Sequence, residues 1–114
     1  AVEAKYSVKI NGFTEITLTK LDILDHFEEI KICVGYECNG EKTEHLSKMI
    51  SCLSDVRPIY KTFEGWNQST SGLKSYNKLP KKTQDYIQFI ADFIAVPVKI
   101  ISIGPGRDEI IKIN

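Results

Sequence analysis

The stretch from residue 80 to residue 103 constrains the fold most, because an expected amphipathic helix leads directly into an expected buried strand. Pro80 suits the first turn of a helix, where its missing N–H costs nothing. An apolar stripe follows at helical spacing, made by Tyr86, Ile87, Ile90, Phe93 and Ile94. Residues 98–103 form a nearly continuous β-branched run, typical of a strand that helices bury on both faces. This succession predicts an α/β fold, with a mixed β-sheet and flanking helices.

A further helix is expected at the start of the chain. Residues 1–11 place Val2, Tyr6 and Ile10 at four-residue spacing, and Gly12 suits the left-handed stop of a helix. The helical pattern begins at the first residue without an N-cap, so we expect this start to be a cut end.

Alternation and β-branched residues predict strands over residues 15–19, 30–37, 58–63 and 110–113. Between the first two strands, Asp22 can cap a short helical turn that runs through Leu24 and Phe27. The remaining segments are an expected turn at Asn39 and Gly40, an expected helix over residues 44–53, and a long loop over residues 64–79. No repeat or linker interrupts the chain, so residues 1–114 are expected to form one domain.

The charge balance argues against polyanionic partners. Fifteen basic and fifteen acidic residues give a formal net charge of zero, whereas binding to a phosphate backbone usually needs a clustered excess of Lys and Arg. No apolar run approaches the roughly 20 residues that cross a bilayer, and the N-terminus lacks the layout of a signal peptide. We therefore expect a cytoplasmic protein that binds neither nucleic acid nor membrane.

The cysteines and histidines do not predict a metal site. Cys33, Cys38 and Cys52 are an odd number without a CxxC pair, so neither a disulfide framework nor a zinc site is expected. His26 and His45 do not complete a four-ligand set at this irregular spacing. We expect ordinary thiols in a reducing compartment, with no metal ligand and no catalytic nucleophile among these five residues.

Two short loops stand out because each directly follows an expected strand, which is where open α/β sheets place ligands. The first covers residues 19–22, and the second covers residues 102–107. In the first loop, the carboxylate of Asp22 can accept hydrogen bonds from both donors of a guanine edge, the ring N1–H and the exocyclic amine. Adenine presents an acceptor in place of N1–H, so this arrangement selects guanine. Lys20 can lay its aliphatic stem over the purine face.

The second loop can contribute main-chain donors. Gly104 allows the backbone to approach a ligand closely, and Pro105 fixes the turn after it, so backbone N–H groups can meet guanine O6. Ser102 adds a hydroxyl group. Arg107 can stack on the base or donate to the ribose.

Each loop alone is also compatible with a purely structural role. Asp22 can cap the turn that follows it while Lys20 is solvated, and the second loop can be an ordinary Gly-Pro turn between two strands. The joint occurrence of the two loops favours a purine site, although periodicity by itself does not choose the purine.

Five segments are similar, in order and spacing, to the C-terminal region of adenylosuccinate synthetases. They are VKINGFTEITLTKLDIL, IKICVGYE, PIYKTFEGW, LPKKTQDYIQFI and VPVKIISIGPGR, which together cover nearly the whole chain. The most specific parts are NGFT with LTKLD, the pair Gly65 and Trp66, and the closing SIGPGR.

The resemblance implies that residues 1–114 are the guanine-binding C-terminal region of a ligase within a larger, P-loop-like nucleotide-binding fold. Enzymes of this family join IMP and L-aspartate in AMP biosynthesis. They use GTP to phosphorylate the IMP 6-oxygen in the presence of Mg²⁺, and they are cytoplasmic homodimers. The residues that match GTP-contacting segments are Lys20, Leu21, Asp22, Ser102, Ile103 and Gly104, with Pro105 and Arg107 as possible further contacts. Gly65 and Trp66 match a loop to which we assign packing.

The catalytic parts of the family have no counterpart in the sequence. Its glycine-rich phosphate loop, catalytic aspartate and histidine, and arginine-rich loop are absent, and phosphoryl transfer needs such groups. We therefore assign no catalytic residue and no metal ligand, and we expect the chain alone to be inactive and to self-associate. Residues 41–55 fit the family least well. The alternatives are a stand-alone guanine-nucleotide-binding module without catalysis and a structural domain without a ligand.

Overall fold

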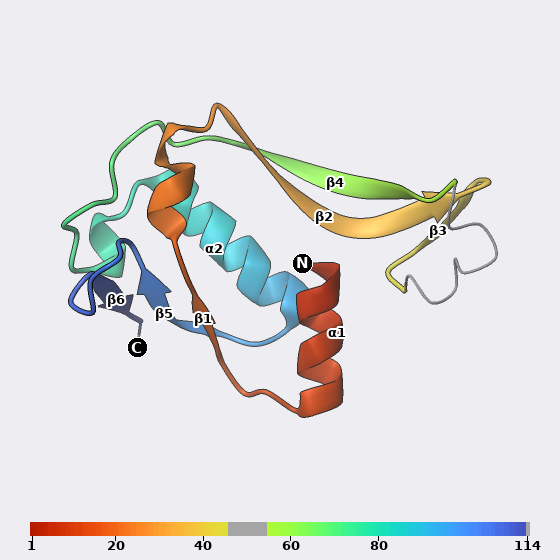
Figure 1. Cartoon of the computed structure of the whole chain (residues 1–114), viewed down its shortest axis with the longest axis horizontal. Helices are drawn as coiled ribbons and strands as arrows, with labels where there is room; N and C mark the ends of the chain where they lie inside the picture. The colour runs from red at the N-terminus through yellow and green to blue at the C-terminus, as the bar shows by residue number, and fades with distance from the viewer. Residues whose placement is uncertain (46–54, 114) are drawn as a thin grey trace.

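Two three-stranded sheets organise the chain in the computed structural model, which describes residues 1–45 and 55–113 (Figure 1). The smaller sheet has the order β1-β5-β6. Its strands are β1 (Ile16–Leu18), β5 (Val98–Ser102) and β6 (Ile110–Lys112). The central strand β5 runs parallel to β1 and antiparallel to β6, so the sheet is mixed, as the sequence predicts.

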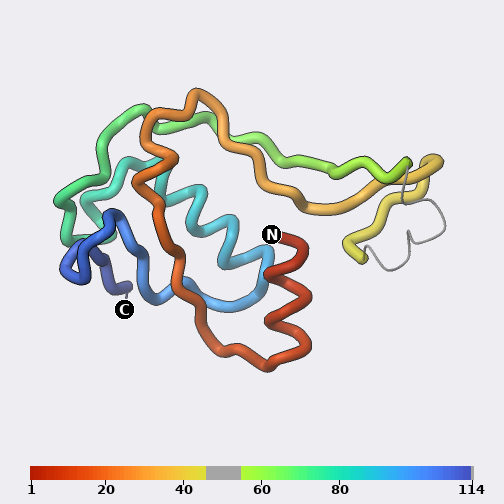
Figure 2. Tube along the Cα trace, in the orientation of Figure 1, coloured from red at the N-terminus to blue at the C-terminus, as the bar shows by residue number. Residues whose placement is uncertain are grey.

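The second sheet has the order β3-β2-β4, and all of its pairs are antiparallel. It consists of β2 (Glu29–Cys38), β3 (Glu41–Thr43) and β4 (Arg57–Glu64). The strands β2 and β4 form a long, twisted arm that passes beside the helices and projects beyond them at its far end (Figures 1 and 2). The turn at Asn39 and Gly40 is confirmed, whereas the short strand β3 was not expected from the sequence.

Helix α2 (Lys81–Ile94) packs on the small sheet and supplies part of the core. It follows Pro80, which occupies the N-cap position rather than the first turn. The expected apolar stripe is confirmed, since Ile87 and Ile94 are each only 2% exposed. The core cluster comprises Leu21, Ile30, Trp66, Leu79, Ile87, Val98, Ile101, Ile103 and Ile111.

Strand β5 is less enclosed than expected. Val98 and Ile101 are buried, but Lys99, Ile100 and Ser102 are only half-buried. Helix α1 (Val2–Asn11) makes its main contacts with α2 and β2.

The end of α1 is as predicted. Gly12 has a left-handed conformation with φ 67°, and its N–H donates to the carbonyl of Val8.

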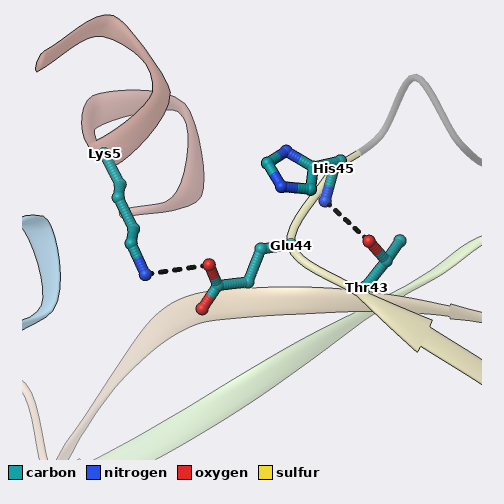
Figure 3. Close-up of polar contacts among 4 residues, drawn as sticks. All are labelled: Lys5, Thr43, Glu44 and His45. Atoms are coloured by element: carbon teal, nitrogen blue, oxygen red, sulfur yellow. Dashed lines mark hydrogen bonds and ion pairs between the residues drawn. The ribbon is translucent and has the colours of Figure 1, made fainter. Parts of the chain in front are cut away.

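Lys5 connects this helix to the second sheet, because its ammonium group lies 2.8 Å from a carboxylate oxygen of Glu44 (Figure 3). The same ammonium group lies 4.7 Å from the centre of the Phe93 ring on α2. Lys5 therefore contacts both α2 and the residue that follows β3.

The helix expected over residues 44–53 falls largely outside the described residues. Its first two residues, Glu44 and His45, are not helical, and the N–H of His45 donates to the hydroxyl of Thr43 (Figure 3). No helix in the described part of the chain is long and apolar enough to span a membrane.

The expectation about the cysteines needs correction at one position. Cys38 is disulfide-bonded and 3% exposed, whereas Cys33 is a half-buried free thiol. Sequence spacing could not predict this bond, because a disulfide depends on the separation and direction of two Cβ atoms in the fold.

Candidate functional site

The two predicted loops leave the small sheet at the same edge. Because β1 and β5 are parallel, with Leu18 paired to Ile101, their carboxyl ends lie side by side. Residues 19–22 and residues 102–107 follow these ends directly. The short helix η1 (Leu21–His26), which includes the end of the first loop, also contacts β5.

Two of the predicted site residues anchor the loops from within. Leu21 and Ile103 are each 1% exposed and belong to the same core cluster. Their side chains are therefore closed to a ligand, and only their main-chain atoms can contribute. The N–H of Ile103 is already engaged, because it donates to the carbonyl of Glu109 at 2.9 Å.

The helix η1 is a 3₁₀-helix, in which side chains three residues apart lie above one another. The sequence LDILDH repeats at this spacing and gives the helix three faces. These faces carry Leu21 with Leu24, Asp22 with Asp25, and Ile23 with His26. The first face packs on the core, and the third is exposed. The second face is polar and carries both carboxylates.

Asp22 does not cap the helix, contrary to one expectation. The N-cap is Lys20, which is exposed and left-handed with φ 57°, and no side chain caps the helix. Asp22 is half-buried, and neither a hydrogen bond nor an ion pair joins its carboxylate to the rest of the described chain. This carboxylate is therefore available to a ligand.

The second loop is a turn built around Glu109. The carboxylate of Glu109 accepts from the N–H of Gly106 at 2.6 Å. It also occupies the space beside Gly104, where an added Cβ would lie 2.4 Å from the Glu109 carboxyl carbon. The hydroxyl of Ser102 donates to the carbonyl of Gly104 at 3.0 Å. The turn is therefore held in shape by its own side chains.

This turn leaves few donors for a ligand. The N–H of Gly106 is taken by Glu109, whereas the N–H of Gly104 donates to nothing within residues 1–45 and 55–113. Pro105 and Arg107 are exposed. Within the described chain, the donors of this loop without an acceptor are therefore the Gly104 N–H and the N–H groups of Arg107.

A buried carboxylate that sequence reasoning missed lies behind the first loop. Asp25 is 3% exposed. It accepts from the indole N–H of Trp66 at 2.8 Å and from the backbone N–H of Thr70 at 2.7 Å. The Thr70 hydroxyl lies 3.0 Å from both carboxylate oxygens. The only sequence signal for Asp25 is its position three residues after Asp22, which is the 3₁₀ spacing.

The packing role assigned to Gly65 and Trp66 is confirmed. A Cβ on Gly65 would lie 1.7 Å from the carbonyl oxygen of Phe27, so only glycine fits. Trp66 is 5% exposed, and its ring lies 5.8 Å from that of Tyr86 on α2. Burial in these surroundings raises the pKa of the Tyr86 hydroxyl.

Two cavities lie away from both loops. One of about 490 Å³ lies between α2 and the start of β5, beside Gln88, Asp92 and Lys99. Another of about 680 Å³ lies at the tip of the arm, beside Glu37 and Arg57. Neither of these two cavities is lined by residues 19–22 or 102–107.

Comparisons with known proteins agree on one family. A sequence model described as adenylosuccinate synthetase matches residues 1–111. The chain is 46% identical to an adenylosuccinate synthetase of Aquifex aeolicus over 110 residues, which cover 96% of the chain and 26% of that relative. A Schizosaccharomyces pombe relative of the same name is 43% identical, with 96% and 25% covered.

A solved structure agrees with these relatives. The fully ligated adenylosuccinate synthetase from Plasmodium falciparum superimposes with a TM-score of 0.84 at 30% identity. The match covers 96% of this chain and 27% of that one. The chain thus spans about a quarter of the length of the relatives it matches.

Proposed function

Because the chain belongs to the adenylosuccinate synthetase family, we propose that it is the guanine-binding region of a longer, GTP-dependent ligase. That enzyme joins IMP and L-aspartate to form adenylosuccinate in AMP biosynthesis. The observation that carries the proposal is the meeting of two loops at one sheet edge, one of which bears the carboxylate of Asp22 without a partner in the described chain.

The chemistry of Asp22 matches guanine. Its two oxygens accept from the ring N1–H and the exocyclic amine, and each charge-assisted bond contributes about 1.5–3 kcal/mol. Adenine offers a lone pair at N1, so it loses one bond and faces repulsion. Lys20 precedes this carboxylate by two residues and is exposed, so its aliphatic stem can cover the purine face.

The second loop complements this edge. The Gly104 N–H has no partner in the described chain and donates to guanine O6. Ser102 lies beside it, and its hydroxyl oxygen keeps a lone pair for a ligand donor. Arg107 is exposed and can reach the base face or the ribose. Leu21, Ile103 and Pro105 shape the loops.

The phosphoryl transfer belongs to other parts of the proposed enzyme. No group of three His, Cys, Asp or Glu residues in the described ranges is arranged to hold a metal ion. We assign no Mg²⁺ ligand to this chain and no step through the metal. Mg²⁺, IMP and L-aspartate are bound by the remaining length of a cytoplasmic, homodimeric enzyme, and this chain alone is inactive.

The substitution Asp22→Asn tests the proposal in the complete enzyme. The amide presents a donor to the guanine amine, so kcat/KM for GTP should fall roughly 5- to 150-fold, equivalent to about 1–3 kcal/mol. Xanthosine triphosphate should be used better than by the parent, because the amide donates to its 2-oxo group. Steady-state kinetics with both nucleotides measure these changes.

Asp92→Asn is the matched control, since Asp92 is exposed on α2 and bonds only to Gln88 within the described chain. It should leave both nucleotides unaffected. Equal GTP kinetics in Asp22→Asn and the parent would remove Asp22 from the guanine site.

A further inference from the structure

We infer that Asp25 is a positioning residue for guanine selection, because its buried carboxylate fixes the rotation of η1 and so the direction of Asp22. This inference rests on the proposed function. Asp25 does not touch the nucleotide. It acts through the helix that it shares with Asp22.

The bonds of Asp25 make a directional anchor. Trp66 donates to one oxygen, and the Thr70 N–H donates to the other, at 2.8 and 2.7 Å. The Thr70 hydroxyl adds a donor at 3.0 Å. No Lys or Arg of the described chain pairs with this carboxylate. A buried charge that relies on neutral donors cannot shift without leaving itself or a donor unsatisfied.

The anchor acts on Asp22 because of the helix type. In a 3₁₀-helix, residues three apart are eclipsed, so Asp22 and Asp25 project from one face of η1. Apolar packing of Leu21 on the neighbouring face is strong but non-directional. Hydrogen bonds depend on angle, so the bonds of Asp25 determine the rotation of the helix.

The loop that carries Trp66 and Thr70 also reaches the neighbourhood of the second predicted loop, residues 102–107. Trp66 and Thr70 hold η1, and a few residues later the ammonium group of Lys74 donates to the carbonyl of Asp108 at 2.7 Å. Asp108 precedes Glu109, which shapes the Gly104 turn. The loop from residue 65 to residue 74 therefore contacts both η1 and the turn that follows β5, and its bonds to Asp25 fix one end of it.

The test compares GTP with inosine triphosphate, which lacks only the guanine 2-amine. In the complete enzyme, Asp25→Asn places an amide donor against Trp66 or Thr70, which also donate. We expect the ratio of kcat/KM for GTP over inosine triphosphate to fall about tenfold, since the second bond to Asp22 is lost. KM for IMP and L-aspartate should stay within about twofold of the parent.

Two variants at Thr70 complete the series. Thr70→Ser keeps both donors to Asp25 and should retain the parental ratio. Thr70→Val removes only the hydroxyl and should give an intermediate ratio, and this variant carries the test if Asp25→Asn does not fold. Circular dichroism and thermal unfolding show which variants are folded.

The outcomes separate this inference from the proposed function. If Asp22→Asn lowers the nucleotide ratio and folded Asp25→Asn or Thr70→Val does not, Asp25 is not a positioning residue, while the guanine assignment stands. A uniform loss of activity with an unchanged ratio likewise assigns Asp25 to stability alone. If Asp22→Asn itself leaves the ratio unchanged, the guanine assignment fails and this inference fails with it.

Discussion

Gly104 lacks a side chain at the point where the Glu109 carboxylate lies against the backbone. In Gly104→Ala, the new Cβ would lie 2.4 Å from the carboxyl carbon of Glu109. Glu109 is flexible and would swing away, losing its bond to the Gly106 N–H. Because one hydrogen bond contributes about 1 kcal/mol, KM for GTP should rise about fivefold in the complete enzyme. Steady-state kinetics would measure this rise in KM.

The effect should depend on Glu109. In a Glu109→Ala background, Gly104→Ala should raise KM for GTP little further, because the carboxylate that it displaces is already gone. Glu109→Gln keeps an acceptor for Gly106 and should resemble the parent. Additive costs in the double variant would show that Gly104 acts without Glu109.

Only some residues of the candidate site could be predicted from the sequence. Asp22 and Gly104 could be selected because each follows a strand and carries an atom that suits guanine. Asp25 could not, since its donors on Thr70 lie 45 residues along the chain and become neighbours only in the fold. Glu109 was missed for a related reason, because its side chain turns back onto a glycine turn that sequence describes only as a break.

The elements were predictable where periodicity was strong. Helix α2 and strand β5 follow directly from the pattern of apolar residues. The capping role of Asp22 was wrong because η1 is a 3₁₀-helix that begins after a left-handed Lys20. The partial exposure of Lys99, Ile100 and Ser102 on β5 depends on packing between distant segments, which no local pattern records.

The junction between β4 and the following loop should be the least tolerant of substitution. In Gly65→Ala, the Cβ would lie 1.7 Å from the carbonyl oxygen of Phe27, and this backbone cannot move as a side chain can. Gly65 also donates to the carbonyl of Glu28 at 2.8 Å. We expect a loss of about 3 kcal/mol in the free energy of unfolding. Denaturant titration followed by fluorescence of Trp66, the single tryptophan, measures it.

Gly12→Ala is the matched control for this change. Gly12 has φ 67° and nothing within 4 Å of an added Cβ, so it isolates the backbone cost of a left-handed alanine. That cost is about 1 kcal/mol. Equal losses at Gly12 and Gly65 would show that the close approach to Phe27 does not limit stability.

The accessible surface area of the molecule is larger than that expected for a compact monomer of the same mass. Its accessible area is 7574 Å², whereas a compact monomer of 12.9 kDa is expected to expose about 6,300 Å². Its radius of gyration is 15.8 Å, against about 13 Å for a compact domain of this length. The projecting arm of β2 and β4 accounts for part of this shape (Figure 2).

Large apolar side chains are exposed on α1 and directly after it. Tyr6 and Ile10 are 56% and 60% exposed, and they lie one turn apart on α1. Phe13 follows them at 51% exposed. We expect such surfaces to meet other parts of the proposed enzyme, and in this chain alone to be open to a second copy.

We therefore expect the isolated chain to self-associate as its concentration rises. Tyr6→Ser combined with Ile10→Ser should shift elution in size-exclusion chromatography toward the monomer, because it removes adjacent apolar surface without touching the core. Tyr60→Ser is the control, since Tyr60 is similarly exposed on β4, at 52%, but belongs to a different element. It should leave elution unchanged. A strictly monomeric parent at high concentration would mean that the α1 surface is not adhesive, whatever it contacts in the complete enzyme.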